Sequence, residues 1–156
     1  MAVDNTKIIK GDDLMVFIGG KSLAFATSHT LSLGTETFDV ASKDHGAFSA
    51  VIPSVLTWEA STENLYSVAG FKTLQDAWLG KQKVQIVFGH STDGTHNEDA
   101  HELQAENWTP YVTEGYLKGD AYITALSVNA NHNENATFSA TFTGCGQLTY
   151  STDALQ

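Results

Sequence analysis

The feature that most constrains the fold of this chain is the strict alternation of apolar and polar residues along several short segments. The clearest example is residues 137–142, which read Thr-Phe-Ser-Ala-Thr-Phe. Successive side chains of a β-strand point to opposite faces, so a period of two is expected where only one face is buried. The segment therefore predicts a strand that sits on an apolar core.

Other segments carry the same signal. Residues 14–18 and 23–26 flank Gly19 and Gly20, a pair that tolerates the positive φ values of a tight hairpin turn. Further alternating sets are Leu56, Trp58 and Ala60; Val84, Ile86 and Phe88; and Tyr122, Thr124, Leu126 and Val128, which face away from Ala121 and Ala125. So many strands predict a mainly β fold, either a β-sandwich or a barrel.

One helix is predicted among these strands, over about residues 70–80. Phe71, Leu74 and Trp78 recur at spacings of three and four, which places them on one side of a helix, and Gly80 is positioned to end it. We expect this helix to cover one face of the sheet.

The length and composition of the chain favour one domain over residues 1–156. A chain of 156 residues with 42% hydrophobic residues can bury one sizeable core. No apolar run reaches 18 residues, and no basic segment followed by an apolar one opens the sequence. We therefore expect neither a membrane-spanning protein nor a secreted one.

The charge of the chain argues against sequence-specific nucleic-acid recognition. Eighteen acidic residues stand against eight basic ones, and all eight are lysine. Reading DNA or RNA normally needs a basic surface and benefits from arginine. Six acids and no lysine lie within residues 84–117, and this acidic segment is interpreted either as a solvated loop or as a surface that repels a polyanion.

Two motifs suggest enzymatic chemistry and fail on spacing. Ser91 lies in Phe-Gly-His-Ser-Thr-Asp-Gly, but Asp93 stands where a nucleophile elbow needs glycine, and Gly94 comes one residue late. Residues 90–102 hold many potential metal ligands, yet their histidine separations match no zinc pattern. We predict no enzyme, no metal and no cofactor; a small hydrolase using Ser91 is the enzymatic alternative.

Cys145, between two glycines, is expected to be a small buried or turn residue.

The loop of residues 39–48, Asp-Val-Ala-Ser-Lys-Asp-His-Gly-Ala-Phe, also looks chemically tempting. Asp44 and His45 are sequence neighbours, so in an extended backbone their side chains point apart and cannot form a catalytic relay. Lys43 lies among small polar residues that do not promise the burial a general base needs. The loop is therefore interpreted as a recognition or spacing element.

Four longer phrases add what periodicity does not: IIKGDDLMVFIGGKSLAFATSHTLSL, ASKDHGAFSA, LTWEASTENLYS and GDAYITALSVNANHNENATFSATFTGCGQL. In this order, over nearly the whole chain, they resemble the major tail tube proteins of long-tailed bacteriophages and prophages, in the versions met in Bacteroidetes-like hosts. Departures from the family are His45, the acidic segment after His90 and a short tail after Leu148. The same fold is similar to the tube proteins of contractile tails and of type VI secretion.

The resemblance implies a β-sandwich or barrel-like tail tube fold with one flanking helix, and a structural role in the virion tail after assembly in the host cytoplasm. Six copies would form a ring whose sheets join edge to edge, and stacked rings would form a tube around a tape measure protein, with terminator or initiator proteins at its ends. DNA would pass as non-specific cargo, and no membrane is involved. Asp39, Ser42, Lys43 and Asp44 are the expected inter-subunit contacts.

The resemblance also gives the acid excess a purpose. Six copies with a formal charge of −10 each give a ring charge of about −60, which would discourage DNA phosphates from adhering. The alternative function is a β-sandwich surface or carbohydrate-binding module, which predicts a monomer with an aromatic patch. Its candidate residues are Trp108, Tyr111 and Tyr116.

Overall fold

The computed structural model describes residues 11, 14–19, 21–23, 25–44, 46, 48–90 and 115–153, and the observations below concern these residues. They form eight strands and one helix, in this order: β1 (Leu14–Ile18), β2 (Lys21–Ser22), β3 (Ala26–Asp39), β4 (Val51–Leu65), α1 (Val68–Leu79), β5 (Lys83–His90), β6 (Tyr116–Asn129), β7 (Thr137–Gly144) and β8 (Thr149–Ser151). The predicted mainly β fold with one helix is confirmed.

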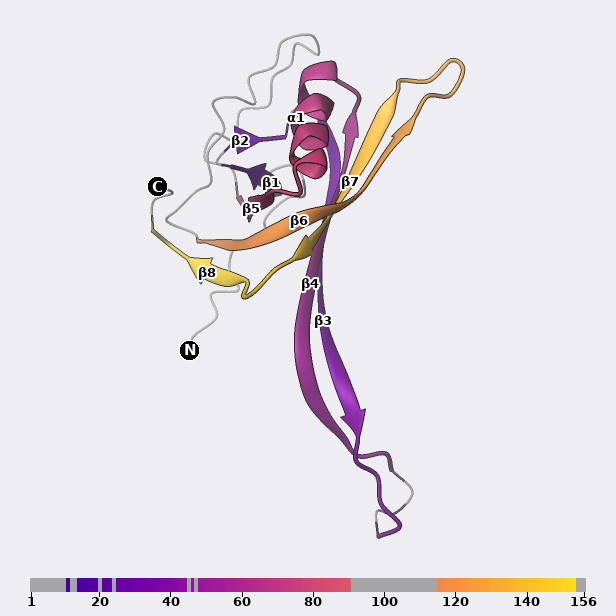
Figure 1. The fold of residues 1–156 in the computed structure, drawn as a ribbon, viewed down its shortest axis with the longest axis vertical. Coiled ribbons are helices and arrows are strands. Elements are labelled where there is room, and N and C mark those ends of the chain that lie inside the picture. The colour runs from indigo at the N-terminus through magenta and orange to yellow at the C-terminus, as the bar shows by residue number, and fades with distance from the viewer. Residues whose placement is uncertain are drawn as a thin grey trace.

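All strand pairs are antiparallel, and the strands form one sheet in the order β2-β1-β5-β6-β7-β4-β3, with β8 added beside β6. Figure 1 shows that this sheet twists strongly between the part that contains β1, β2 and β5 and the part that contains β4 and β7. The predicted hairpin at Gly19 is present, but its second strand is Lys21–Ser22 rather than residues 23–26. Leu23 instead packs into the core.

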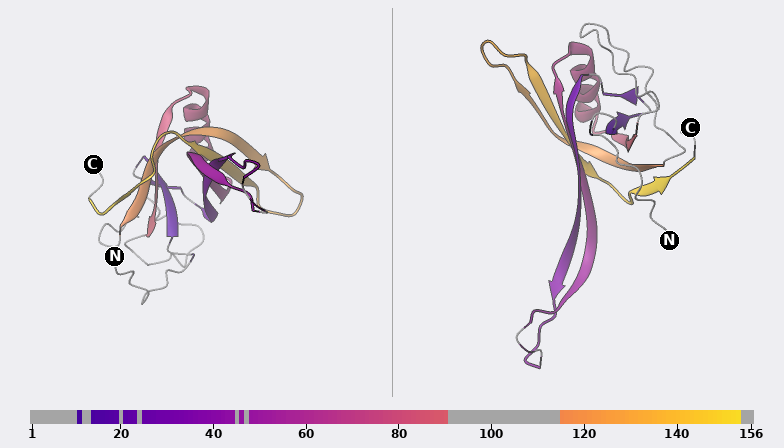
Figure 2. Two further views of the ribbon diagram at one scale, coloured as in Figure 1. Left: turned by 90° about the horizontal axis from the view of Figure 1, so that it is seen from below. Right: turned by 180° about the vertical axis from the view of Figure 1, so that it is seen from behind.

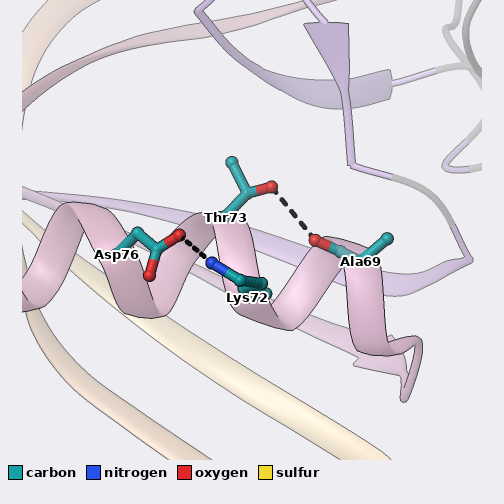
Figure 3. A network of polar contacts seen from close by, with 4 residues as sticks. All are labelled: Ala69, Lys72, Thr73 and Asp76. Carbon is teal, nitrogen blue, oxygen red and sulfur yellow. Dashed lines mark hydrogen bonds and ion pairs between the residues drawn. The ribbon is translucent and has the colours of Figure 1, made fainter.

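α1 begins two residues before the predicted start, because Ser67 caps it. The Ser67 side chain accepts a hydrogen bond from the backbone N–H of Gly70 at 3.2 Å, and Gly80 ends the helix as expected. The outward side carries the polar contacts of Figure 3, an ion pair between Lys72 and Asp76 and a bond from the Thr73 hydroxyl to the Ala69 carbonyl.

The inward side of α1 covers the sheet, as predicted. Leu74 is buried, and the ring of Phe71 meets that of Phe138 edge to face at 5.7 Å. In β7 the predicted alternation holds, since Phe138, Ala140 and Phe142 are all buried. The face of the sheet that carries these three residues is called the covered face, and the opposite one the open face.

Trp58 marks the point where β4 enters the core. Its indole is buried and donates a hydrogen bond from Nε1 to the Gly146 carbonyl at 3.0 Å. The ring lies directly over two glycines: a Cβ added at Gly144 would come within 2.2 Å of it, and one added at Gly119 within 2.6 Å. Only residues without a side chain permit this approach of β6 and β7 to the indole.

The alternation predicted for residues 122–128 is wrong at its start. β6 carries a bulge between Ile123 and Ala125, which puts one extra residue into the strand. Before the bulge the buried residues are Ala121 and Ile123, and after it Leu126 lies opposite Ala140 on the covered face. Tyr122 therefore points to the open face, because a one-residue insertion reverses the period.

One further expectation of burial is wrong. Leu56 shares the face of Trp58 but is 77% exposed, because β4 extends past the core at this point. Cys145 is exposed in the turn after β7, where its backbone N–H bonds to the Asp120 carbonyl at 2.7 Å. Its position in a turn, by contrast, is as predicted.

A small polar group interrupts the core where β3 meets β4. Asn64 and Thr62 are buried, and the Asn64 amide donates to the Thr62 hydroxyl at 3.1 Å. His29 pairs with Thr62 across the strands, and neither of its ring nitrogens has a hydrogen-bond partner. Burial lowers the pKa of His29 from 6.5 to about 4, which keeps the imidazole neutral at physiological pH.

Candidate assembly surface

The outer parts of β3 and β4, with the loop that joins them, form a long projection, residues 33–56, which is called the arm. Figure 1 shows the arm extending from the body along the longest axis of the molecule, with α1 towards the opposite end. The view from behind in Figure 2 shows it equally clear of the other described elements. Among the described residues, the arm has only itself to pack against.

The arm is strongly apolar although it lies in solvent. Of the fifteen large apolar residues that are exposed in the described part of the chain, eight lie in the arm: Leu33, Phe38, Val40, Phe48, Val51, Ile52, Val55 and Leu56. Phe48 at the tip is 88% exposed. A contiguous apolar surface of this kind marks an interaction site, because a single subunit gains nothing by exposing it.

The strand register shows how these side chains are arranged. Leu33 pairs with Trp58, and Leu56 pairs with Thr35, so Leu33 and Leu56 continue the covered face beyond the core. Phe38 pairs with Ile52 nearer the tip. Side chains of directly paired residues lie on the same face. The apolar stripe of the core thus continues uncovered as far as Leu56. Beyond the irregularity that the register shows between Thr35 and Thr37, Phe38 and Ile52 lie on the other face, so the arm carries apolar side chains on both faces.

The arm also presents an unpaired sheet edge. β3 is the last strand in the sheet order, is 14 residues long and pairs only with β4 among the described elements. Edge strands are usually protected by lysine, proline or shortness, because their free N–H and C=O groups recruit another chain. β3 contains neither lysine nor proline, so this edge is open to pairing.

The four predicted contact residues lie together at the end of the arm. Asp39 ends β3, and its Oδ1 accepts a hydrogen bond from the backbone N–H of Ala41 at 2.8 Å. Ser42, Lys43 and Asp44 follow in the loop, and all are exposed. Their neighbour His45 lies outside the described residues. The arrangement presents hydrogen-bonding groups and charges of both signs at the tip.

The open face of the sheet has a different chemistry. Over β3, β4, β7 and the second half of β6 it is lined by hydroxyl side chains: Thr30, Ser32, Thr57, Ser61, Ser127, Ser139, Thr141 and Thr143. Ser127 and Ser139 bond to each other across the strands at 3.1 Å. Glu59 and Glu63 lie on this surface in the body and Glu36 in the arm, and these strands contribute no lysine. Over these strands the open face of the body is therefore hydrophilic and acidic, whereas Lys83 and Tyr122 lie on the same face where β5 meets β6.

The residues of the alternative functions, an aromatic binding patch, a hydrolase and a metal site, are mostly buried or outside the described part of the chain. Tyr116 is buried and donates its hydroxyl proton to the Asp153 carbonyl, so it cannot contribute to an exposed aromatic patch. Ser91, Trp108, Tyr111 and nearly all of the acidic segment lie outside the described residues. Within the described part of the chain no group of three potential metal ligands gathers. The same residues contain no helix long and apolar enough to cross a membrane.

Sequence reasoning placed the contact residues in the loop but missed the apolar arm behind it. A signal was available in residues 51–56, Val-Ile-Pro-Ser-Val-Leu, where apolar residues occur on both faces of one strand. A strand at the surface of a monomer alternates, whereas a strand covered on both faces does not. The break in alternation indicates a strand that is completed by another chain.

Three solved structures are similar to this fold. The tail of an empty gene transfer agent particle, refined helically with C6 symmetry, superposes with a TM-score of 0.67 and 15% identity over 92% of this chain and 99% of that one. A chain from the virion of the native gene transfer agent particle gives 0.65 and 14%, with the same coverage. The tail tube of SPP1 gives 0.62 and 16%, over 92% of this chain and 79% of that one.

At these identities the structural likeness establishes the fold, and the sequence comparison goes further. No curated protein is similar enough in sequence to be matched. The family described as phage tail tube protein matches residues 14–150, which include every strand of the sheet except the last residue of β8. This chain belongs to the phage tail tube protein family.

Proposed function

We propose that this protein assembles into stacked rings of six subunits that form a phage tail tube, and that the arm makes the contacts which hold the tube together. The observation that carries the proposal is the arm, an apolar hairpin with an open edge that the described part of its own subunit leaves uncovered. The six-fold ring is supported by the C6 symmetry of a structurally similar tail.

Edge pairing explains how such a subunit can make a closed ring. A head-to-tail interface joins two different surfaces of the same molecule, and it closes when the rotation between copies divides the circle. β3 offers one such surface, because its backbone groups on the side away from β4 await a partner strand. At the arm tip, Asp39, Ser42, Lys43 and Asp44 supply polar contacts to an adjacent copy.

The open face is proposed to line the bore of the tube. α1 occupies the covered face, so a ring that joins sheets edge to edge leaves the open face for its inside. Glu59 and Glu63 repel phosphate, and six copies place twelve such carboxylates in each ring. Weak contact suits DNA that passes through, since tight contact would hold it.

Other partners follow from the role of a tail tube. The bore would enclose a tape measure protein during assembly, and terminator and initiator proteins would cap the two ends. The subunit acts as a structural component and uses no catalytic step, with the virion tail as its final location.

The experiment removes the apolar stripe of the arm without touching the core. Leu33→Ser together with Leu56→Ser changes two side chains that are 69% and 77% exposed, so the isolated subunit should keep its urea midpoint. Burying each leucine in a contact stabilises it by about 1.5–3 kcal/mol. Together they contribute about 3–6 kcal/mol, so the association constant should fall by about 100-fold or more.

Electron microscopy and sedimentation velocity read out the assembly. A matched control is Ser32→Ala with Thr57→Ala, which changes the same two strands on the open face; this variant should still form tubes. Tubes of normal abundance from the double serine variant would refute the role of the arm.

A further inference from the structure

A second apolar surface lies on the body, beside the C-terminal half of α1. Trp78 is 47% exposed and Leu79 is 63% exposed, although the sequence predicts that Trp78 faces the sheet. Tyr122 and Ile123 of β6 line the hollow beside them. Tryptophan and tyrosine dominate the energetics of protein interfaces when they become buried.

This surface is hollowed. One cavity of about 330 Å³ lies between Trp78, Leu79 and Tyr122, and a second of about 340 Å³ lies between Phe71, Trp78 and Leu126. Trp78 lines both, so the two hollows adjoin this side chain between α1 and β6; together they are called the α1/β6 groove. A groove with apolar walls accepts apolar side chains that project from another surface.

We propose that the α1/β6 groove of one subunit receives the arm of a second copy. The proposal deepens the assembly function proposed above and rests on it, because it assigns the surface that covers the arm. The arm carries exposed apolar side chains on both faces of a narrow hairpin, and the hollows beside Trp78 offer apolar walls that such a hairpin can enter.

The shape of the subunit fits this contact. In Figure 1 and in the right view of Figure 2, the arm tip lies at one end of the long axis and α1 towards the other. Moving one copy along this axis therefore brings its arm towards the helix side of the next. Such a contact joins unlike surfaces and can repeat indefinitely, as a stack of rings requires.

The charges also fit. Lys81 lines the groove. The arm tip carries two acids, Asp39 and Asp44, and one lysine, Lys43, so its net charge is negative. Pairs at the rim of an interface add little affinity, but they steer the partner and fix its register. An acidic tip approaching a lysine-bearing groove satisfies that requirement.

The alternative binding site for the arm is the exposed apolar patch at the N-terminal end of α1, which contains Tyr66 and Val68. Its hollow, lined by Phe25, Tyr66 and Ala136, is smaller, at about 260 Å³, and carries no charged side chain. It therefore offers an acidic arm tip no complementary charge. It serves as the matched control in the experiment.

The experiment joins the two surfaces chemically in assembled tubes. Cys145 is exposed, so Cys145→Ser provides the background. Ile52→Cys on the arm is combined with Leu79→Cys at the groove, and in the control with Val68→Cys; all three positions are more than half exposed. Tubes are treated with a short bismaleimide and separated under denaturing conditions. We expect a ladder of linked subunits from the Leu79 pair and only monomer from the Val68 pair.

A second variant tests the groove without a linker. Trp78→Ala should raise the subunit concentration needed for tube formation by about tenfold or more, as loss of an interface tryptophan does. Its urea midpoint checks that the subunit remains folded.

The outcomes separate this inference from the proposed function. Equal ladders from both cysteine pairs, a ladder from the Val68 pair alone, or tubes without any ladder would overturn the groove assignment and leave tube formation standing. Failure of the unmodified protein to form tubes at any concentration would overturn both proposals.

Discussion

Replacing Gly144 by alanine tests how the body holds the arm. The added Cβ would lie 2.2 Å from Cε2 of Trp58 and 2.3 Å from its Nε1, well inside the distances that carbon atoms tolerate. The indole cannot retreat easily, because Nε1 is bonded to the Gly146 carbonyl and the ring already lies against Gly119. Either the ring turns out of its site or the strands move apart.

The cost follows from these contacts. Forcing an extra methyl group into a packed core costs about 1–3 kcal/mol, and losing the indole hydrogen bond adds about 1 kcal/mol. We therefore expect Gly144→Ala to lower the free energy of unfolding by about 2–4 kcal/mol. Because Trp58 is the first buried residue of β4 after the arm, assembly should weaken together with stability.

Urea unfolding of the unassembled subunit, followed by circular dichroism, measures this change. Gly46→Ala is the matched control, because a Cβ at Gly46 meets no atom within 4 Å, and its midpoint should stay within experimental error. If Gly144→Ala were as stable as the unmodified chain, Trp58 would not be held as tightly as the structure indicates.

Two further predictions concern pH and the bore. Because burial lowers the pKa of His29 to about 4, the unfolded chain binds more protons between pH 4 and 6.5, and stability should fall as pH falls through this window. The full shift corresponds to about 3 kcal/mol; partial exposure reduces it to about 1–2 kcal/mol. In urea titrations His29→Gln should flatten this dependence, whereas the same change at exposed His132 should leave it intact. Glu59→Lys with Glu63→Lys should let assembled tubes retain DNA in a filter-binding assay at low salt, and equal retention by unmodified tubes would contradict an acidic bore.

Local sequence patterns predicted the elements whose side chains pack within one subunit. The alternation in residues 137–142 and the spacing of Phe71 and Leu74 identified β7 and α1, because burial against the same core produces both periods. The errors have local causes. The bulge at residue 124 reverses the pattern of β6 without leaving a signal in composition.

The candidate site was predicted only in part, for a different reason. The sequence indicated the loop that holds Asp39 and Asp44, but it placed Leu56 in the core. A leucine that awaits another subunit has the same composition and spacing as one buried in its own, and only the three-dimensional position of the strand separates them. Burial in an assembly is a property of many chains, which one sequence encodes indirectly.

The unprotected border of β3 makes the timing of synthesis matter. A strand of 14 residues without lysine or proline, rich in serine and threonine, specifies its pairing register weakly. Subunits that accumulate quickly would therefore pair in wrong registers as well as the right one, and the share of regular tubes would fall. Slow accumulation gives each strand time to leave a wrong register before the next copy binds.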